Sequence, residues 1–351
     1  MFVYYAVFIL AFLLCTFDYI DDGIVKRGIY ISFCTILILL PGLKSIGTDN
    51  DSSNYEEIFR ISAAISYSDG FAGRYEENTE RGYLLLNKVV NSLGGDINSL
   101  FLVVALLTGV LNYTLFYKLC EYPFTAVLIY ISFFYLYRDF TQIRYGLSCA
   151  LVFWSVYYFL KPHYLLGFLF FVLSLLIHST SLILILVLPI CYLIKNRYLY
   201  AILPVFCLVG LVINPFPILL SLGGVPEHMQ IYFDEEGGGG FVVSFIGLLM
   251  MALYLFFNRK IMSENFNFSM YYRLLAVGVS LNLLFIQASI FQRFSHLFFQ
   301  CSVLFLPNVL KELEKSTYKY YFVMMHFLFN CFFLYYGCKL IEPILIRPYF
   351  Q

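Results

Sequence analysis

The sequence predicts an all-α polytopic membrane protein with about 11–12 transmembrane helices. Hydrophobic residues make up 61% of the chain and charged residues only 13%, about half the charged fraction of an average soluble domain. The mean hydropathy is +0.80. Many apolar runs are long enough to cross about 30 Å of hydrocarbon, where a helix satisfies all its own backbone polar groups. These observations exclude an ordinary water-soluble domain.

The predicted spans follow one another along a single integral membrane domain that covers residues 1–351. They lie near 2–17, 27–43, 99–119, 124–138, 142–160, 164–177, 180–194, 199–215, 241–257, 270–290, 294–310 and 319–341. Met1 leads straight into an apolar run without a basic region. We therefore expect the first span to be retained rather than removed as a signal peptide.

The stretch 164–194 decides the topology of the second half of the chain. As one helix it would be about 46 Å long, well beyond the hydrocarbon thickness. A turn at His178-Ser-Thr-Ser181 would divide it into two short arms. With that turn, and with the N-terminus outside, the basic residues fall in short cytoplasmic loops, as the positive-inside rule requires. We therefore predict a hairpin at His178.

Two longer loops are then external. Residues 44–98 contain Ile58, Ile61 and Ile65 at helical spacing, which predicts a short amphipathic helix on the membrane surface. Residues 214–240 contain four consecutive glycines and form an external Gly-rich loop. This second loop is either a flexible connector or a flap that orders over a ligand.

Four basic side chains stand at the external ends of predicted spans: Arg138, Arg144, His178 and Arg293. Ionisable groups at this depth are costly and usually functional. Arginine binds phosphate with a planar, permanently charged fork of donors, so the set predicts an anion site for a lipid phosphate or pyrophosphate. The alternatives are that each arginine pairs with a nearby carboxylate or reaches the interface, and that His178 is a satisfied core residue.

A sugar-transfer reaction also needs a group that takes the proton from the attacking hydroxyl. Asp49, Asp51 and Glu80 in the first loop are candidates, and so is His178, whose ordinary pKa lies near neutrality. The sequence does not choose among them. Because the nine cysteines show no metal-ligand spacing and no dense acidic cluster occurs, we expect no metal or other cofactor. The zero net charge and the lack of a basic stripe argue against nucleic acid.

Taken together, these motifs resemble the EpsG-like family of polysaccharide polymerases, a branch of the Wzy-type O-antigen and capsule polymerases. The matching pieces are Gly47-Thr-Asp, Asn54-Tyr55, Phe59, Glu80 with Gly82-Tyr83-Leu-Leu85, Arg138, Ile143-Arg144-Tyr-Gly146, His178-Ser179, Ser181-Leu-Ile183, Arg293 and Arg347-Pro-Tyr-Phe350. Two details depart from the family pattern. Both Asp49 and Asp51 satisfy parts of the rule for the first acid, and Tyr145 replaces the usual glutamine.

The resemblance implies a glycosyltransferase-C-like bundle in the bacterial inner membrane, with its active site on the periplasmic face. It implies transfer of a growing glycan from undecaprenyl pyrophosphate to a lipid-linked repeat unit, with inversion and without a metal. Arg144 and Arg293, with Arg138 as a lesser candidate, would hold the pyrophosphate. His178 or Asp51 would orient or deprotonate the acceptor hydroxyl, and Tyr55, Tyr83 and Tyr145 are candidate sugar-binding residues.

Other readings remain open at this point. An O-antigen ligase would use the same donor and differ in its acceptor. A flippase or transporter for lipid-linked oligosaccharide would distribute polar groups through the bilayer midplane, where this sequence has few. A structural membrane subunit would leave the arginines without a role. Membrane lipid is an expected partner, and a separate chain-length co-polymerase is a further candidate.

Overall fold

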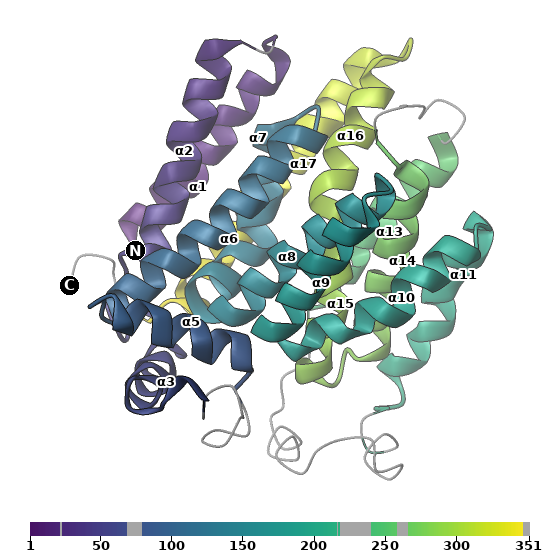
Figure 1. Ribbon diagram of the computed structural model, residues 1–351. Helices are drawn as coiled ribbons and strands as arrows, with labels where there is room; N and C mark the ends of the chain where they lie inside the picture. Colours follow the sequence, from purple (N-terminus) through teal and green to yellow (C-terminus); the bar gives the residue numbers. More distant parts are fainter. Residues whose placement is uncertain (22, 69–78, 216, 218–239, 258–265, 347–351) are drawn as a thin grey trace. The chain divides into compact units, whose positions relative to one another are not determined.

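The computed structural model describes residues 1–351 except 22, 69–78, 216, 218–239, 258–265 and 347–351 (Figure 1). The described part of the chain is helical and contains no strand, which confirms the predicted all-α class. The helices are α1 (Phe2–Leu14), α2 (Ile24–Gly42), α3 (Ser52–Ala64), α5 (Arg81–Ser92), α6 (Ile97–Leu119), α7 (Pro123–Tyr130), α8 (Ile143–Leu160), α9 (Tyr164–Ile177), α10 (Leu184–Leu193), α11 (Arg197–Cys207), α13 (Phe241–Phe257), α14 (Phe268–Leu284), α15 (Gln292–Phe299), α16 (Ser302–Glu314) and α17 (Lys319–Ile344). A π-helix, Ile131–Thr141, joins α7 to α8.

Each predicted span coincides with one or two helical segments, and the protein is a multi-pass membrane protein. Within the described residues, five segments are long and apolar enough to cross a bilayer: Phe2–Tyr19, Ile24–Gly42, Ile97–Leu119, Ile143–Leu160 and Lys319–Ile344. Five other apolar helical segments are only 10–17 residues long. Helices of that length need neighbouring protein or a thinner bilayer to cross.

The long apolar stretch 164–194 is broken at His178, as the sequence predicts. Helix α9 ends there because His178 adopts an extended conformation, with φ −156° and ψ 126°. A short 3₁₀ turn, Ser179–Ile183, then leads into α10. Helix α9 packs on α8, whereas α10 packs on α14. The break is confirmed, and the hairpin geometry stays a prediction.

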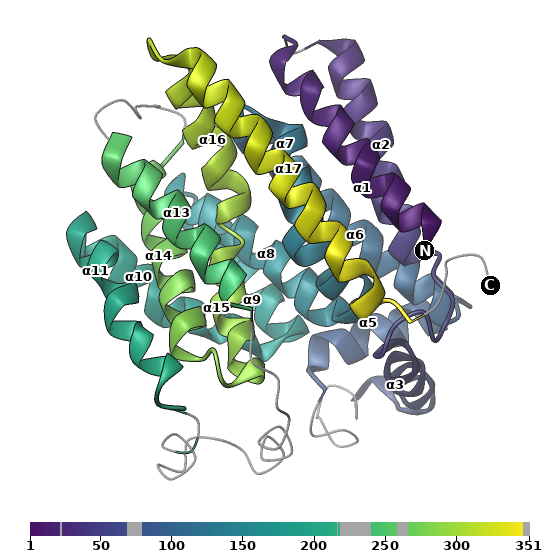
Figure 2. The same ribbon diagram turned by 180° about the vertical axis from the view of Figure 1, so that it is seen from behind.

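The chain divides into two compact units, so its description as a single integral membrane domain remains a prediction. The first unit comprises Met1–Ser181 and Tyr320–Gln351, and α8 packs most extensively on α9 within it. Helix α17, yellow in Figure 2, joins this unit through a buried polar chain. Thr125 Oγ1 donates to Asp18 Oδ2 at 2.7 Å and lies 2.8 Å from His326 Nε2.

The second unit, Leu182–Lys319, is built around α14. Arg273 on α14 is buried, and its guanidinium donates to the carbonyl oxygens of Cys191 and Ile194 at the end of α10. The terminal carbonyls of a helix lack partners within the helix, so this arginine caps α10. The predicted external loop 214–240 falls almost entirely outside the described residues.

The first loop, 44–98, contains α3 and α5 (Figure 1). The predicted helix is present as α3, but its apolar residues are not left for a membrane surface. Ile58 and Phe59 pack with Leu84 of α5 and with residues of α6 and α8 in one core cluster. The amphipathic face is therefore buried against protein, because α5 and α6 offer a complementary apolar surface at the end of the bundle.

Candidate active site

Glu80 lies at the centre of the polar cluster in the first unit. It is the residue that immediately precedes α5, and α5 lies against the end of α9. The contact is close at Gly82, where a Cβ would come within 2.6 Å of the backbone oxygen of Leu176. Any larger residue would push the two helices apart. Glycine at this position therefore allows Glu80 to reach the chain that follows α9.

Arg144 approaches Glu80 from the first turn of α8. Its Nη1 atom donates to Glu80 Oε2 at 3.0 Å, and the two side chains are 22% and 19% exposed. The guanidinium carbon also lies 5.9 Å from the centre of the Tyr55 ring and 5.5 Å from that of Tyr83. Two rings, one from α3 and one from α5, thus hold Arg144 in a half-buried position. Its ion pair with Glu80 is the pairing with a nearby carboxylate that the sequence left open as an alternative.

His178 and Ser179 complete the cluster from the break after α9. Ser179 donates to Glu80 Oε1 from its backbone N–H at 2.9 Å and from its hydroxyl at 3.2 Å. His178 Nδ1 lies 3.7 Å from the same oxygen but accepts the backbone N–H of Thr180 at 3.2 Å. From this donor we assign the proton of the neutral ring to Nε2. In this tautomer Nδ1 is the acceptor and Nε2 is the donor, and the catalytic role of His178 stays a prediction.

Tyr145 and Arg138 form a deeper layer behind His178. The Tyr145 and His178 rings meet edge to face, with centroids 5.5 Å apart. Arg138, on the π-helix, is 2% exposed and lies over the rings of Phe134 and Tyr145. Long π-helical segments are rare and occur mainly at functional sites. Arg138 is thus enclosed among aromatic side chains, and its expected contact with a pyrophosphate stays a prediction.

Gly146 sets how closely the start of α8 lies to the π-helix. A Cβ at Gly146 would meet the backbone oxygen of Arg138 at 2.8 Å. Backbone atoms cannot move aside as a flexible side chain can. The Ile143-Arg144-Tyr-Gly146 motif therefore places one arginine toward Glu80 and brings its tyrosine against the other arginine.

Asp49 has a structural position that does not fit the predicted catalytic role. Its Oδ2 atom accepts from Lys44 Nζ at 2.7 Å, and both side chains are 0% exposed. Its Oδ1 atom accepts the backbone N–H groups of Asp51 and Ser52, each at 3.0 Å. Burial lowers the pKa of Lys44, and the carboxylate of Asp49 opposes this shift. Both oxygens are thus used to fold the turn before α3.

Two further candidates are Asp51 and Arg293. Asp51 is the N-cap residue of α3 and is half-buried beside the same turn. Arg293 is a half-buried residue of α15 in the second unit. His296 follows it one turn later, 3.5 Å from Asn282 Nδ2. Among the residues that the structure describes, no three His, Cys, Asp or Glu side chains form a group that could hold a metal ion.

The cluster of Glu80, Arg144, His178 and Ser179 combines the elements of a group-transfer site. A carboxylate can accept a proton, a guanidinium can stabilise a departing phosphate, and an imidazole N–H can donate to an oxygen. Sequence reasoning found three of these residues. It named Ser179 only as part of the His178-Ser179 motif and gave it no role.

Comparisons with known proteins identify the family. The model of the EpsG family matches residues 27–350. A curated protein of Erwinia amylovora, amylovoran biosynthesis protein AmsC, is 24% identical over 196 residues, or 54% of this chain and 51% of that protein. The similarity thus spans about half the length of that relative. No solved structure matches, so the glycosyltransferase-C-like architecture stays a prediction.

Proposed function

This chain belongs to the EpsG family, and we propose that it is a polysaccharide polymerase. In this proposal it transfers a growing O-antigen or exopolysaccharide chain from undecaprenyl pyrophosphate to the next lipid-linked repeat unit. The similarity to a protein of amylovoran biosynthesis supports a role in making polysaccharide. The observation that carries the proposal is the salt bridge of Arg144 and Glu80 at the break after α9.

Arg144 is the proposed pyrophosphate ligand. A guanidinium carries five N–H donors, and the contact with Glu80 is made through Nη1. A diphosphate that docks beside this pair lies next to the permanent positive charge of the guanidinium. Because the site is half-buried, this electrostatic stabilisation is stronger than in water. Arg293 of the second unit is a second candidate for the same role, and Arg138 supports the site through Tyr145.

Glu80 is the proposed general base. The acceptor hydroxyl attacks the anomeric carbon, and its proton passes to the Glu80 carboxylate. The bond from the anomeric carbon to the pyrophosphate oxygen breaks, and the electron pair leaves with undecaprenyl pyrophosphate. Direct displacement inverts the anomeric carbon. His178 donates from Nε2 to a sugar or phosphate oxygen, while Tyr55 and Tyr83 beside Arg144 offer faces for sugar stacking.

The proposed setting is the bacterial inner membrane, with the site on the periplasmic face and the lipid-linked oligosaccharide as partner. The positive-inside rule supports this orientation. Within the first unit, Arg27 and Lys118 both line a pocket between α2 and α6. Glu80 instead lies with the loop helices that pack near the start of α6. The proposed reaction uses no metal, and a chain-length co-polymerase would be a separate partner.

The test is polymerisation by the purified protein in proteoliposomes supplied with lipid-linked repeat units. We expect Arg144→Lys to lower the rate of elongation about 100-fold or more, because lysine lacks the planar fork of donors. Arg60→Lys is the matched control, since Arg60 is an exposed residue of α3. Normal elongation by Arg144→Lys would refute the pyrophosphate role. In a parallel assay with lipid A added to the proteoliposomes, transfer of glycan to lipid A without elongation would identify a ligase.

A further inference from the structure

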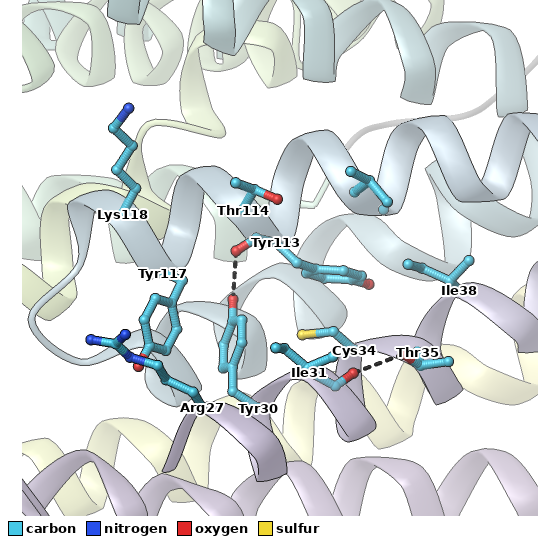
Figure 3. Close-up of a pocket in the computed structure, with 12 residues that line it drawn as sticks. Arg27, Tyr30, Ile31, Cys34, Thr35, Ile38, Tyr113, Thr114, Tyr117 and Lys118 are labelled. Atoms are coloured by element: carbon cyan, nitrogen blue, oxygen red, sulfur yellow. Dashed lines mark hydrogen bonds between the residues drawn. The ribbon is translucent and has the colours of Figure 1, made fainter. Parts of the chain in front are cut away.

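A separate cavity of about 550 Å³ lies between α2 and α6 in the first unit, among residues the proposed reaction does not use (Figure 3). Its lining is mostly apolar or aromatic and includes Ile31, Ile38, Val110 and Tyr113. The rims are open, because Ile31 is 63% exposed and Val110 is 50% exposed. A pocket of this size is large enough for a small molecule or part of a lipid chain.

Two cationic side chains stand at one end of this cavity. Helices α2 and α6 run antiparallel, since Gly42 lies against Leu102 while Tyr30 donates to the carbonyl oxygen of Tyr113 at 2.9 Å. The start of α2 therefore lies beside the end of α6. Figure 3 shows Arg27 and Lys118 at the same end, one on each helix.

The aromatic residues at this end are also arranged as at a membrane interface. The rings of Tyr30 and Tyr117 lie 4.8 Å apart in the cavity wall. The Lys118 ammonium lies 4.7 Å from the centre of the Tyr157 ring and 5.7 Å from that of Trp154. Tyrosine and tryptophan are enriched where a helix leaves the hydrocarbon, and basic pockets between helices on the cytoplasmic side bind anionic lipid head groups.

We propose that the α2–α6 cavity binds an anionic phospholipid of the cytoplasmic leaflet. One acyl chain lies between the two helices, and the phosphate lies between Arg27 and Lys118. The charge at one end and the apolar remainder match the two parts of such a lipid. Because the cavity opens on exposed apolar surface of both helices, a lipid enters it sideways from the bilayer.

This site differs from the proposed catalytic one. Phe101 belongs to the core cluster that contains Tyr55 and Tyr83, next to Glu80. Lys118 is seventeen residues further along α6, about 25 Å at the helical rise. The lipid phosphate is therefore at the opposite end of the helix pair from Arg144, and the occupant is not the carrier in its reacting position.

Trp154 gives a direct readout, since the chain contains a single tryptophan. Its indole Nε1 donates to the carbonyl oxygen of Leu111 at 2.9 Å, which holds the ring beside α6. The full-length protein is placed in vesicles of phosphatidylcholine that contain a small fraction of brominated phosphatidylglycerol or, in parallel, brominated phosphatidylcholine. The measured quantity is the ratio of Trp154 quenching by these two lipids.

We expect brominated phosphatidylglycerol to quench Trp154 at a mole fraction about tenfold lower than brominated phosphatidylcholine. Both lipids carry a phosphate, but only phosphatidylglycerol has a net negative charge, because the choline cation neutralises the phosphate of phosphatidylcholine. Arg27→Gln/Lys118→Gln should bring the ratio close to one. Arg27→Lys/Lys118→Arg keeps both charges and should keep the preference. Lys161→Gln, which removes an exposed lysine outside the cavity, is the matched control.

Three results would overturn the proposal. Equal quenching by both lipids in the natural protein would show that the cavity has no preference for an anionic head group. A preference that survives Arg27→Gln/Lys118→Gln would place the lipid elsewhere. Displacement of brominated phosphatidylglycerol by a trace of undecaprenyl phosphate would assign the cavity to the polyprenyl carrier. The test measures binding alone, so its result is independent of polymerase activity.

Discussion

Replacement of Glu80 by glutamine separates the proposed base from a merely structural carboxylate. The side chain keeps its shape, but an amide has one acceptor oxygen where the carboxylate has two. Glu80 uses both oxygens, Oε1 for Ser179 and Oε2 for Arg144. In Glu80→Gln, therefore, either Ser179 or Arg144 faces the amide N–H₂ group and loses its acceptor.

The structural cost of this change is moderate. A half-buried donor left without its partner costs about 1–3 kcal/mol. Loss of one member of a fully buried ion pair would cost about 3–5 kcal/mol, and an exposed one less than about 1 kcal/mol. Since the Arg144 and Glu80 side chains are 22% and 19% exposed, we expect the free energy of unfolding to fall by about 2 kcal/mol. The protein should still fold and insert.

The catalytic cost is larger. A general base contributes about 100-fold to 10,000-fold to the rate, so elongation by Glu80→Gln should fall by at least about 100-fold. The assay is elongation of lipid-linked repeat units by proteoliposomes. The control for the fold is the amount of variant that inserts and remains helical, so that a slower rate is not mistaken for a loss of protein.

Two variants complete the experiment. Glu80→Asp restores a carboxylate on a shorter side chain and should recover part of the rate. Glu56→Gln is the matched control, because Glu56 is an exposed glutamate of α3. If Glu80→Gln elongates within about threefold of the natural enzyme, the assignment of Glu80 as base is wrong.

Three further predictions concern the elements that position the site. Lys44→Met should lower the free energy of unfolding by about 3 kcal/mol, and the melting temperature with it, because it leaves Asp49 charged and buried. The double variant Lys44→Met/Asp49→Asn should recover part of this loss. Gly82→Ala should reduce elongation by forcing α5 from α9, whereas Gly28→Ala, which has open space for its Cβ, should not. Hydrogen bonds from the first turn of α6 lower the pKa of Asp96, so this cap stabilises above the ordinary aspartate pKa and is lost as the pH falls through the lowered value. The protection of the amides in that turn against hydrogen exchange, measured relative to their intrinsic exchange rates, should therefore fall in acid, and unchanged protection would contradict the capping role.

The sequence located the helices well because hydropathy and length reflect the one constraint that the bilayer imposes on every span. It also located the break at His178, because one additional crossing there decides on which side of the membrane every later basic loop lies. It did not foresee that α3 would bury its apolar face against α5 and α6. Amphipathic periodicity shows that a helix has an apolar face but not whether lipid or protein covers it.

The choice among the candidate acids illustrates the same difference at the site. In the sequence, Asp49, Asp51 and Glu80 are equivalent as acids of a loop that is predicted to be external, and their spacing cannot rank them. The structure places Asp49 with Lys44 in a buried turn, and places Glu80 against Arg144 and Ser179. The contacts of Glu80 join residues 64 and 99 positions apart, so no local pattern in the chain records them.

By itself, then, the sequence determined that this is a helical membrane protein and which basic side chains stand at the ends of its spans. These are consequences of solvent and of short-range periodicity, which act on each segment separately. Only the tertiary structure decided which carboxylate meets Arg144, that Arg138 is enclosed behind Tyr145, and that α2 and α6 leave a cavity between them. Those features depend on how distant helices pack, and close packing at positions such as Gly82 and Gly146 is a property of the pair of helices rather than of either sequence.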